Sequence, residues 1–114
     1  MKKGLFLTPI FLVFLLFPPF TYAGQWSGSV NITKIYPNSN DNGDGTIYFE
    51  FSVMNNPDGE CESPNYIALL KSNKLESEIY SLALSAYMAN KQVTYYVNGC
   101  DALGHPVLLH MNLH

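Results

Sequence analysis

The chain has 114 residues, of which 47% are hydrophobic and 13% charged, with a formal net charge of −3. This length allows one small domain and excludes a multidomain enzyme. This acidic balance argues against a nucleic-acid partner, because phosphate contacts need clustered Lys and Arg side chains. The motifs of dinucleotide-binding and P-loop domains are absent.

Residues 1–23 have the pattern of a secretory signal peptide. A basic start is followed by an apolar run and by a small-residue cleavage site after Ala23. We therefore expect one mature domain, residues 24–114, which contains four lysines and nine acidic residues. The alternative is a membrane anchor, but Pro18 and Pro19 interrupt the apolar run before it reaches the ~20 residues that a spanning helix needs. The prediction is a secreted or periplasmic protein without a stable membrane anchor.

Alternating apolar and polar residues predict a strand hairpin in the first half of this domain. Residues 26–33 alternate from Trp26 onward, and the next apolar pair is out of phase, so we expect a bulge near Lys34. Residues 37–45 contain the residue types of a surface loop. Residues 46–54 give the clearest strand. Its predicted buried face consists of Ile47, Phe49, Phe51 and Val53.

The second half predicts a strand, a helix and two further strands. Residues 65–70 are a short apolar run between turn residues. Asn73 and Glu76 have the spacing of a helix cap with its capping-box partner, and Asn90 suits a left-handed helix end. The predicted buried helix face consists of Leu75, Ile79, Leu82, Ala83 and Ala86, and the last two strands bury Val93, Tyr95 and Val97, then Val107, Leu109, Met111 and Leu113. The fold class is mainly β with one helix, in the order β-β-β-α-β-β.

Two cysteines, Cys61 and Cys100, suggest one disulfide, because an exported protein meets an oxidising environment. The bond would close a loop of 40 residues. The alternative is a Cys100 nucleophile with His105 and Asp101 nearby, which requires a free thiolate and a positioned base.

The order of elements resembles that of the OB-fold B subunits of bacterial AB5 toxins, including the subtilase-cytotoxin and pertussis-like type. The closest stretch is residues 80–97, where a helix rich in Ala and Tyr runs into Asn-Lys-Gln-Val-Thr-Tyr-Tyr-Val. The resemblance implies a small OB-like barrel, here closed by one disulfide, and a pentameric ring. It assigns no sugar-binding residue to this chain.

Two groups of residues are candidate metal sites. Asn40, Asn42, Asp44 and Gly45 imitate the start of an EF-hand calcium loop, but position 12 of that loop is Phe51, which has no carboxylate. His110 and His114 share a strand face, yet their Cα atoms would lie ~13 Å apart. We expect no metal and no cofactor.

Three tyrosines are candidate ligand-binding residues: Tyr36, Tyr48 and Tyr96. Tyr48 and Tyr96 are predicted on outward strand faces and Tyr36 at the neighbouring loop, where aromatic rings can stack on a sugar or another flat ligand. The alternative is ordinary surface tyrosines with high strand propensity.

The predicted helix carries a second apolar face, formed by Tyr80, Leu84, Tyr87 and Met88, with Ser77, Ser81 and Ser85 beside it. A domain of this size cannot bury both helix faces in one core. The second face is therefore predicted to contact another copy of the chain or a secreted protein partner, the alternative being simple exposure.

No carboxylate pair, Ser-His-Asp arrangement or metal triad stands out in the sequence, which favours a binding module over an enzyme. We expect a non-catalytic exported module that binds a glycan or a protein, as a toxin B subunit does. The alternative is a small secreted enzyme or enzyme inhibitor.

Overall fold

The structure is a computed structural model that describes residues 24–39, 45–56 and 59–114. These residues are mainly β with one helix, in the order β-β-β-β-α-β-β. The elements are β1 (Gln25–Trp26), β2 (Ile32–Asn38), β3 (Thr46–Phe51), β4 (Ile67–Leu70), α2 (Glu76–Ala89), β5 (Val93–Cys100) and β6 (Pro106–Leu113). The predicted signal peptide lies outside the described residues, and so do Asn40, Asn42 and Asp44 of the candidate calcium loop.

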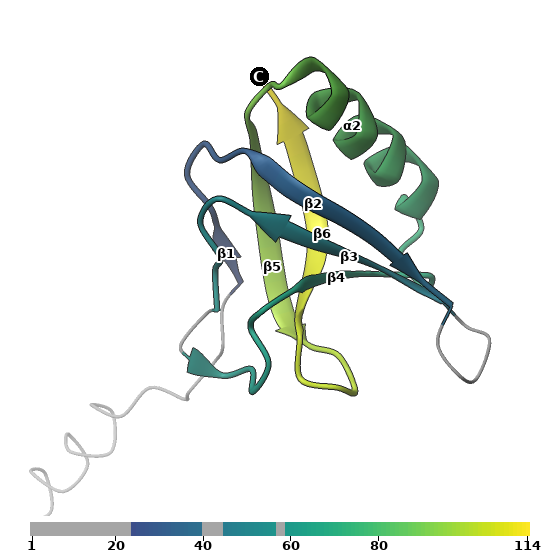
Figure 1. The fold of residues 1–114 in the computed structure, drawn as a ribbon. Helices are drawn as coiled ribbons and strands as arrows, with labels where there is room; N and C mark the ends of the chain where they lie inside the picture. The colour runs from purple at the N-terminus through teal and green to yellow at the C-terminus, as the bar shows by residue number, and fades with distance from the viewer. Residues whose placement is uncertain (1–23, 40–44, 57–58) are drawn as a thin grey trace, which may run out of the picture.

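The strands form one curled sheet in the order β1-β5-β6-β4-β3-β2. β4 and β6 are parallel, and the other neighbours are antiparallel. Both end strands come from one stretch of chain, residues 25–38, which also bridges to β5 through Val30 and Val93. Figure 1 shows β5 and β6 crossing the direction of β2, β3 and β4. The sheet therefore curls as in a small barrel, although its hydrogen bonding does not close into a continuous ring.

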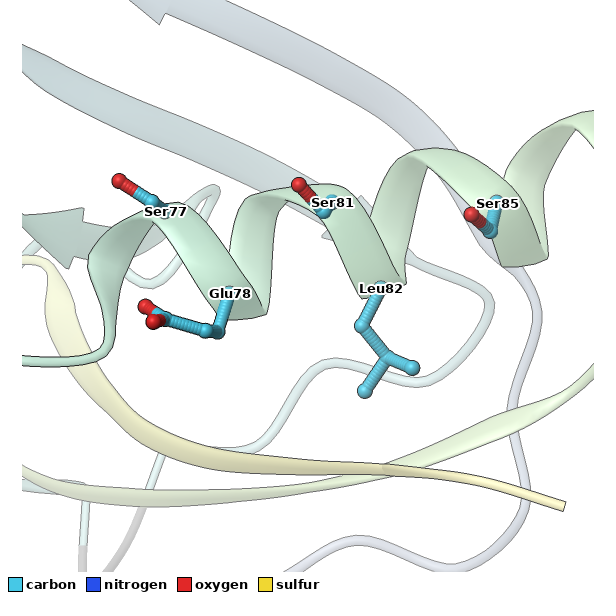
Figure 2. A pocket seen from close by; sticks show the side chains of 5 residues that line it. All are labelled: Ser77, Glu78, Ser81, Leu82 and Ser85. Carbon is cyan, nitrogen blue, oxygen red and sulfur yellow. The ribbon is translucent and has the colours of Figure 1, made fainter.

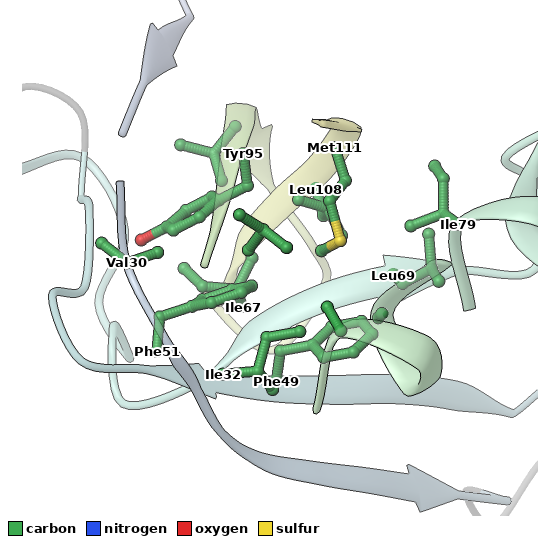
Figure 3. Close-up of a cluster of buried hydrophobic side chains, with 14 residues drawn as sticks. Val30, Ile32, Phe49, Phe51, Ile67, Leu69, Ile79, Tyr95, Leu108 and Met111 are labelled. Atoms are coloured by element: carbon green, nitrogen blue, oxygen red, sulfur yellow. The ribbon is translucent and has the colours of Figure 1, made fainter. Parts of the chain in front are cut away.

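The core lies between the curled sheet and α2, which packs against β6 and β2 (Figure 3). Phe51 and Tyr95 stack at its centre, with ring centroids 4.0 Å apart and planes inclined by 15°. Every element except β1 contributes a side chain. The buried cluster consists of Val30, Ile32, Phe49, Phe51, Ile67, Leu69, Ile79, Ala83, Ala86, Val93, Tyr95, Val97, Leu108 and Met111.

The predicted bulge in the first hairpin is confirmed, because the register between β2 and β3 shifts between Ile32 and Lys34. β2 continues through Pro37 to Asn38, so two residues predicted in the loop belong to the strand. Pro37 has no backbone N–H to donate. It is tolerated because β2 is an edge strand of the sheet, and one side of an edge strand pairs with no neighbour.

The predicted burial is wrong for residues in three of the predicted strands. Trp26 is exposed and Ser27 is buried, since Ser27 Oγ accepts a 2.9 Å hydrogen bond from the Tyr95 amide. Val53 lies beyond the end of β3 and is exposed. In β6 an extra residue opposite β5 changes the phase, so Leu108 enters the core in place of Leu109, and Leu113 is exposed.

The helix begins later than predicted and ends as predicted. Leu75 is its N-cap residue and is exposed, so it does not belong to the buried face. The side chain of Asn73 still organises this turn, because its Oδ1 accepts a 2.9 Å hydrogen bond from the Leu75 amide. Asn90 adopts the left-handed conformation at the C-cap, with φ 55° and ψ 45°.

The predicted disulfide between Cys61 and Cys100 is present. It ties the loop that precedes β4 to the end of β5. The Ser63 amide reinforces this link by donating a 2.9 Å hydrogen bond to the Gly104 carbonyl. Gly104 has φ +90° and lies so close to Glu62 that a side chain would crowd it. Within the residues described, no helix has the length and apolar character to span a membrane.

Candidate functional site

Four aromatic rings gather on the outer face of the sheet, opposite the core, and we call them the tyrosine cluster: Tyr36, Tyr48, Tyr66 and His105. Tyr36 and Tyr48 face each other across β2 and β3 with ring centroids 5.9 Å apart. Tyr66 lies 5.8 Å from Tyr36 and 5.5 Å from Tyr48. The hairpin and the start of β4 thus bring together rings that are up to 30 residues apart.

Lys34 covers one side of the tyrosine cluster. Its Nζ donates a 3.0 Å hydrogen bond to the Tyr66 hydroxyl and lies 5.5 Å and 5.3 Å from the ring centroids of Tyr36 and Tyr66. The bond to Tyr66 raises the pKa of Lys34, and the carboxylate of Glu50, its partner across the strands, acts in the same direction. The ammonium group therefore stays charged at neutral pH, beside two aromatic rings.

The turn between β5 and β6 delivers His105 to the opposite side of the cluster. Asp101 shapes this turn, because its Oδ1 accepts hydrogen bonds from the amides of Leu103 (2.9 Å) and His105 (2.8 Å). Its Oδ2 lies 3.1 Å from His105 Nδ1, and both side chains are largely buried. His105 packs on Tyr48 with ring centroids 4.8 Å apart. The pair therefore supports the floor of the cluster.

Tyr48 faces outward as predicted, but only 4% of its surface is exposed. Tyr36, Tyr66 and His105 cover it. Burial raises the pKa of Tyr48, and the carboxylate of Asp101 adds to the effect. The ring is therefore a neutral, packed floor, and the prediction that it offers a free stacking surface is wrong. Tyr36, at 39% exposure, is the most exposed ring of the cluster.

Tyr96, the third predicted binding residue, lies in a separate group that we call the Trp26 cluster: Trp26, Tyr96 and His110. The structure thus brings together two of the three predicted tyrosines and leaves the third among β1, β5 and β6. Sequence reasoning missed Lys34, Tyr66 and Trp26 as site residues. The alternation that placed Tyr48 on the outer face also applies to Tyr36 and Lys34, but Tyr66 precedes its strand and had no such signal.

The exposed helix face is less extensive than predicted. Leu84, Tyr87 and Met88 are exposed, whereas Tyr80 is partly buried and packs against the core. Beside them, Figure 2 shows Ser77, Ser81 and Ser85 following one another along α2. With Glu78 and Leu82 they line a shallow hollow that is widely open to solvent. Such a surface encloses no ligand.

The other candidate reactive groups are the Cys100 thiol and the imidazoles of His110 and His114. Cys100 is bonded to Cys61, so it cannot be a thiolate nucleophile, and the described residues contain no free cysteine. His110 lies in the Trp26 cluster, while His114 Nε2 is 3.3 Å from Thr94 Oγ1. In residues 24–39, 45–56 and 59–114 no three His, Cys, Asp or Glu side chains gather as metal ligands would.

No protein-family model and no curated protein matches this sequence.

Proposed function

We propose that this chain is an exported, non-catalytic binding module that binds a glycan at the tyrosine cluster. The observation that carries the proposal is the exposed ring of Tyr36 beside the Lys34 ammonium and the Tyr66 hydroxyl. A sugar ring can stack on the face of an aromatic side chain while its hydroxyls bond to polar groups at the rim. Lys34 Nζ and the amide of Asn38, which donates a 3.2 Å hydrogen bond to the Tyr36 hydroxyl, provide that rim.

Packing around the site supports binding rather than catalysis. The Asp101 and His105 side chains contact each other beside the cluster, and Asp101 is also engaged by two backbone amides of its own turn. His105 is packed against Tyr48, and both hold the exposed rings in place. A preformed surface of this kind reduces the entropy lost on binding.

Export accounts for the disulfide. Disulfides persist in oxidising compartments, and the bond between Cys61 and Cys100 fits an extracytoplasmic location. Together with the sequence pattern of residues 1–23, this supports a mature protein that begins at Gly24 and is released across a membrane.

A glycan array probed with residues 24–114 tests the proposed function. We expect Tyr36→Ala to weaken binding about tenfold, because one stacked ring contributes on the order of 1 kcal/mol beyond its buried area. Val53→Ala is the control, since Val53 is also exposed but lies beyond the end of β3, outside the tyrosine cluster. A blank array, or equal binding by the two variants, would exclude the tyrosine cluster as a glycan site.

We also propose that the exposed helix residues Leu84, Tyr87 and Met88 contact a second copy of the chain. The charged residues of α2 are Glu76 and Glu78, both in its first turn, so the rest of the helix is uncharged. In a chain with excess acidic residues, this uncharged surface is where two copies meet with little repulsion.

Light scattering on the purified mature chain tests this contact. We expect an oligomer that Leu84→Glu converts to a monomer, because the new carboxylate would be buried without a partner. Leu103→Glu, at an exposed loop position, should leave the assembly intact. A monomeric parent chain, or equal masses for both variants, would contradict the proposal.

A further inference from the structure

The Trp26 cluster forms a second aromatic surface on strands that carry no part of the tyrosine cluster. Trp26 pairs with Tyr96 across β1 and β5, and Tyr96 pairs with His110 across β5 and β6. Residues paired in this way point to the same face of a sheet. The rings of Trp26 and His110 are nearly parallel, inclined by 26° with centroids 6.1 Å apart, and Tyr96 lies 5.3 Å from each.

Backbone packing holds these rings in place while leaving them open to water. A side chain at Gly24 would collide with the ring and hydroxyl of Tyr96, so the chain entering β1 runs directly against that ring. Ser27, next to Trp26, exchanges hydrogen bonds with Tyr95 and fixes the start of the strand. Trp26 nevertheless remains 47% exposed, and His110 is exposed as well. The result is a preorganised aromatic surface.

The strands that carry the Trp26 cluster, β1, β5 and β6, contain no Asp, Glu, Lys or Arg. Thr94 and Asn112 pair across β5 and β6 two residues beyond Tyr96 and His110, on the same face, and His114 lies 3.3 Å from Thr94. Hydroxyl, amide and imidazole groups can each donate and accept hydrogen bonds. This contrasts with the tyrosine cluster, where a lysine ammonium covers the rings.

We propose that the Trp26 cluster is a separate binding site for a neutral sugar ring. The apolar face of the sugar stacks on Trp26, and its hydroxyls bond to His110 and to the uncharged side chains beyond it. Aromatic rings flanked by neutral polar groups match a ligand that combines a C–H face with hydroxyls and has no charge to pair. This inference goes beyond the proposed function, because it concerns a second site on other strands, and it holds whether or not the tyrosine cluster binds.

Trp26 is the single tryptophan of the chain, so its fluorescence reports on this site alone. We expect methyl β-D-glucopyranoside or methyl β-D-galactopyranoside to change the emission saturably, with a Kd on the order of 1 mM. His110→Ala should weaken that binding at least several-fold. Tyr36→Ala, in the tyrosine cluster, should leave it unchanged, which separates this site from the proposed function. Saturation-transfer NMR should detect the same sugar on the Tyr36→Ala chain and lose it when Trp26→Ala is added to that variant.

A charged sugar tests the ligand class. In a chain that begins at Gly24, the positively charged α-amino group lies near Tyr96 and would attract an acidic sugar. Methyl β-D-glucuronide is therefore titrated beside the two neutral glycosides. We expect it to bind no more tightly than the glucoside. Tighter binding of the uronate would overturn the neutral class. The site itself would be overturned if neither neutral glycoside changed the emission, or if the double variant Tyr36→Ala with Trp26→Ala retained the NMR signal.

Discussion

Replacing Cys61 and Cys100 together with alanine is expected to lower the free energy of unfolding by about 4 kcal/mol. The disulfide joins residues 39 positions apart, and closing a loop of that length removes about this much conformational free energy from the unfolded chain. Since a small domain is stabilised by only about 5–15 kcal/mol in total, the loss is a large fraction. Urea unfolding of the parent and the double variant, followed by circular dichroism, measures the difference.

The same substitution is expected to loosen the tyrosine cluster. The disulfide joins the loop that carries Tyr66 to the strand that leads into Asp101 and His105. These two segments place Tyr66 and His105 in the cluster, with ring centroids 6.3 Å apart. The parent chain after reduction and alkylation is the control for the added alanines and should lose the same stability. Equal urea-unfolding midpoints of the parent chain before and after reduction would contradict the predicted stabilisation by the disulfide.

Local patterns predicted the elements because these depend on residues close together in the sequence. Alternation identified β3, and the break in phase before Tyr36 located the bulge that the register shift confirms. Asn90 signalled the helix end because few other residues adopt a left-handed conformation readily. The pairing of Cys61 with Cys100 followed from there being only two cysteines.

Burial was less predictable, because it depends on the partner strand. Leu109 has the apolar character of a core residue, but the extra residue in β6 opposite β5 sends Leu108 inward instead. Leu75 has the right spacing for the buried helix face, yet the helix starts after it. The first difference follows from strand pairing, which no local sequence window contains, and the second from the residue at which the helix begins.

The candidate site was only half predictable for the same reason. Tyr36 and Tyr48 belong to one hairpin, so alternation places them together. Tyr66 and His105 join them only because β4 pairs with β3 and, in parallel, with β6. That crossover also covers Tyr48, which is why a ring predicted to face water is buried. Tyr96 is separated from these rings because β4 and β6 lie between its strand and β3.

Tyr95→Ala is expected to cost about 4 kcal/mol of the free energy of unfolding, because removing a large buried ring leaves a cavity beside Phe51. Tyr95→Phe isolates the hydroxyl from the ring. That hydroxyl donates a 2.8 Å hydrogen bond to the Val53 carbonyl and accepts a 2.9 Å bond from the Asn55 amide. Losing both partners is expected to cost about 2 kcal/mol. Urea unfolding at pH 7 measures both variants, and a Tyr95→Phe variant as stable as the parent would show that the hydroxyl contributes nothing.

The same hydroxyl predicts how stability changes at alkaline pH. Burial raises the pKa of Tyr95 to about 12, whereas an unfolded tyrosine titrates near pH 10. As the pH rises from about 10 to about 12, the unfolded chain loses this proton first, so the free energy of unfolding falls across that interval. Below pH 10 neither state is ionised and the contribution of Tyr95 is fully present. The stability difference between the parent and Tyr95→Phe should therefore shrink between pH 10 and 12, since both proteins share every other titrating group. A constant difference across that range would mean that Tyr95 ionises equally in the folded and unfolded chains.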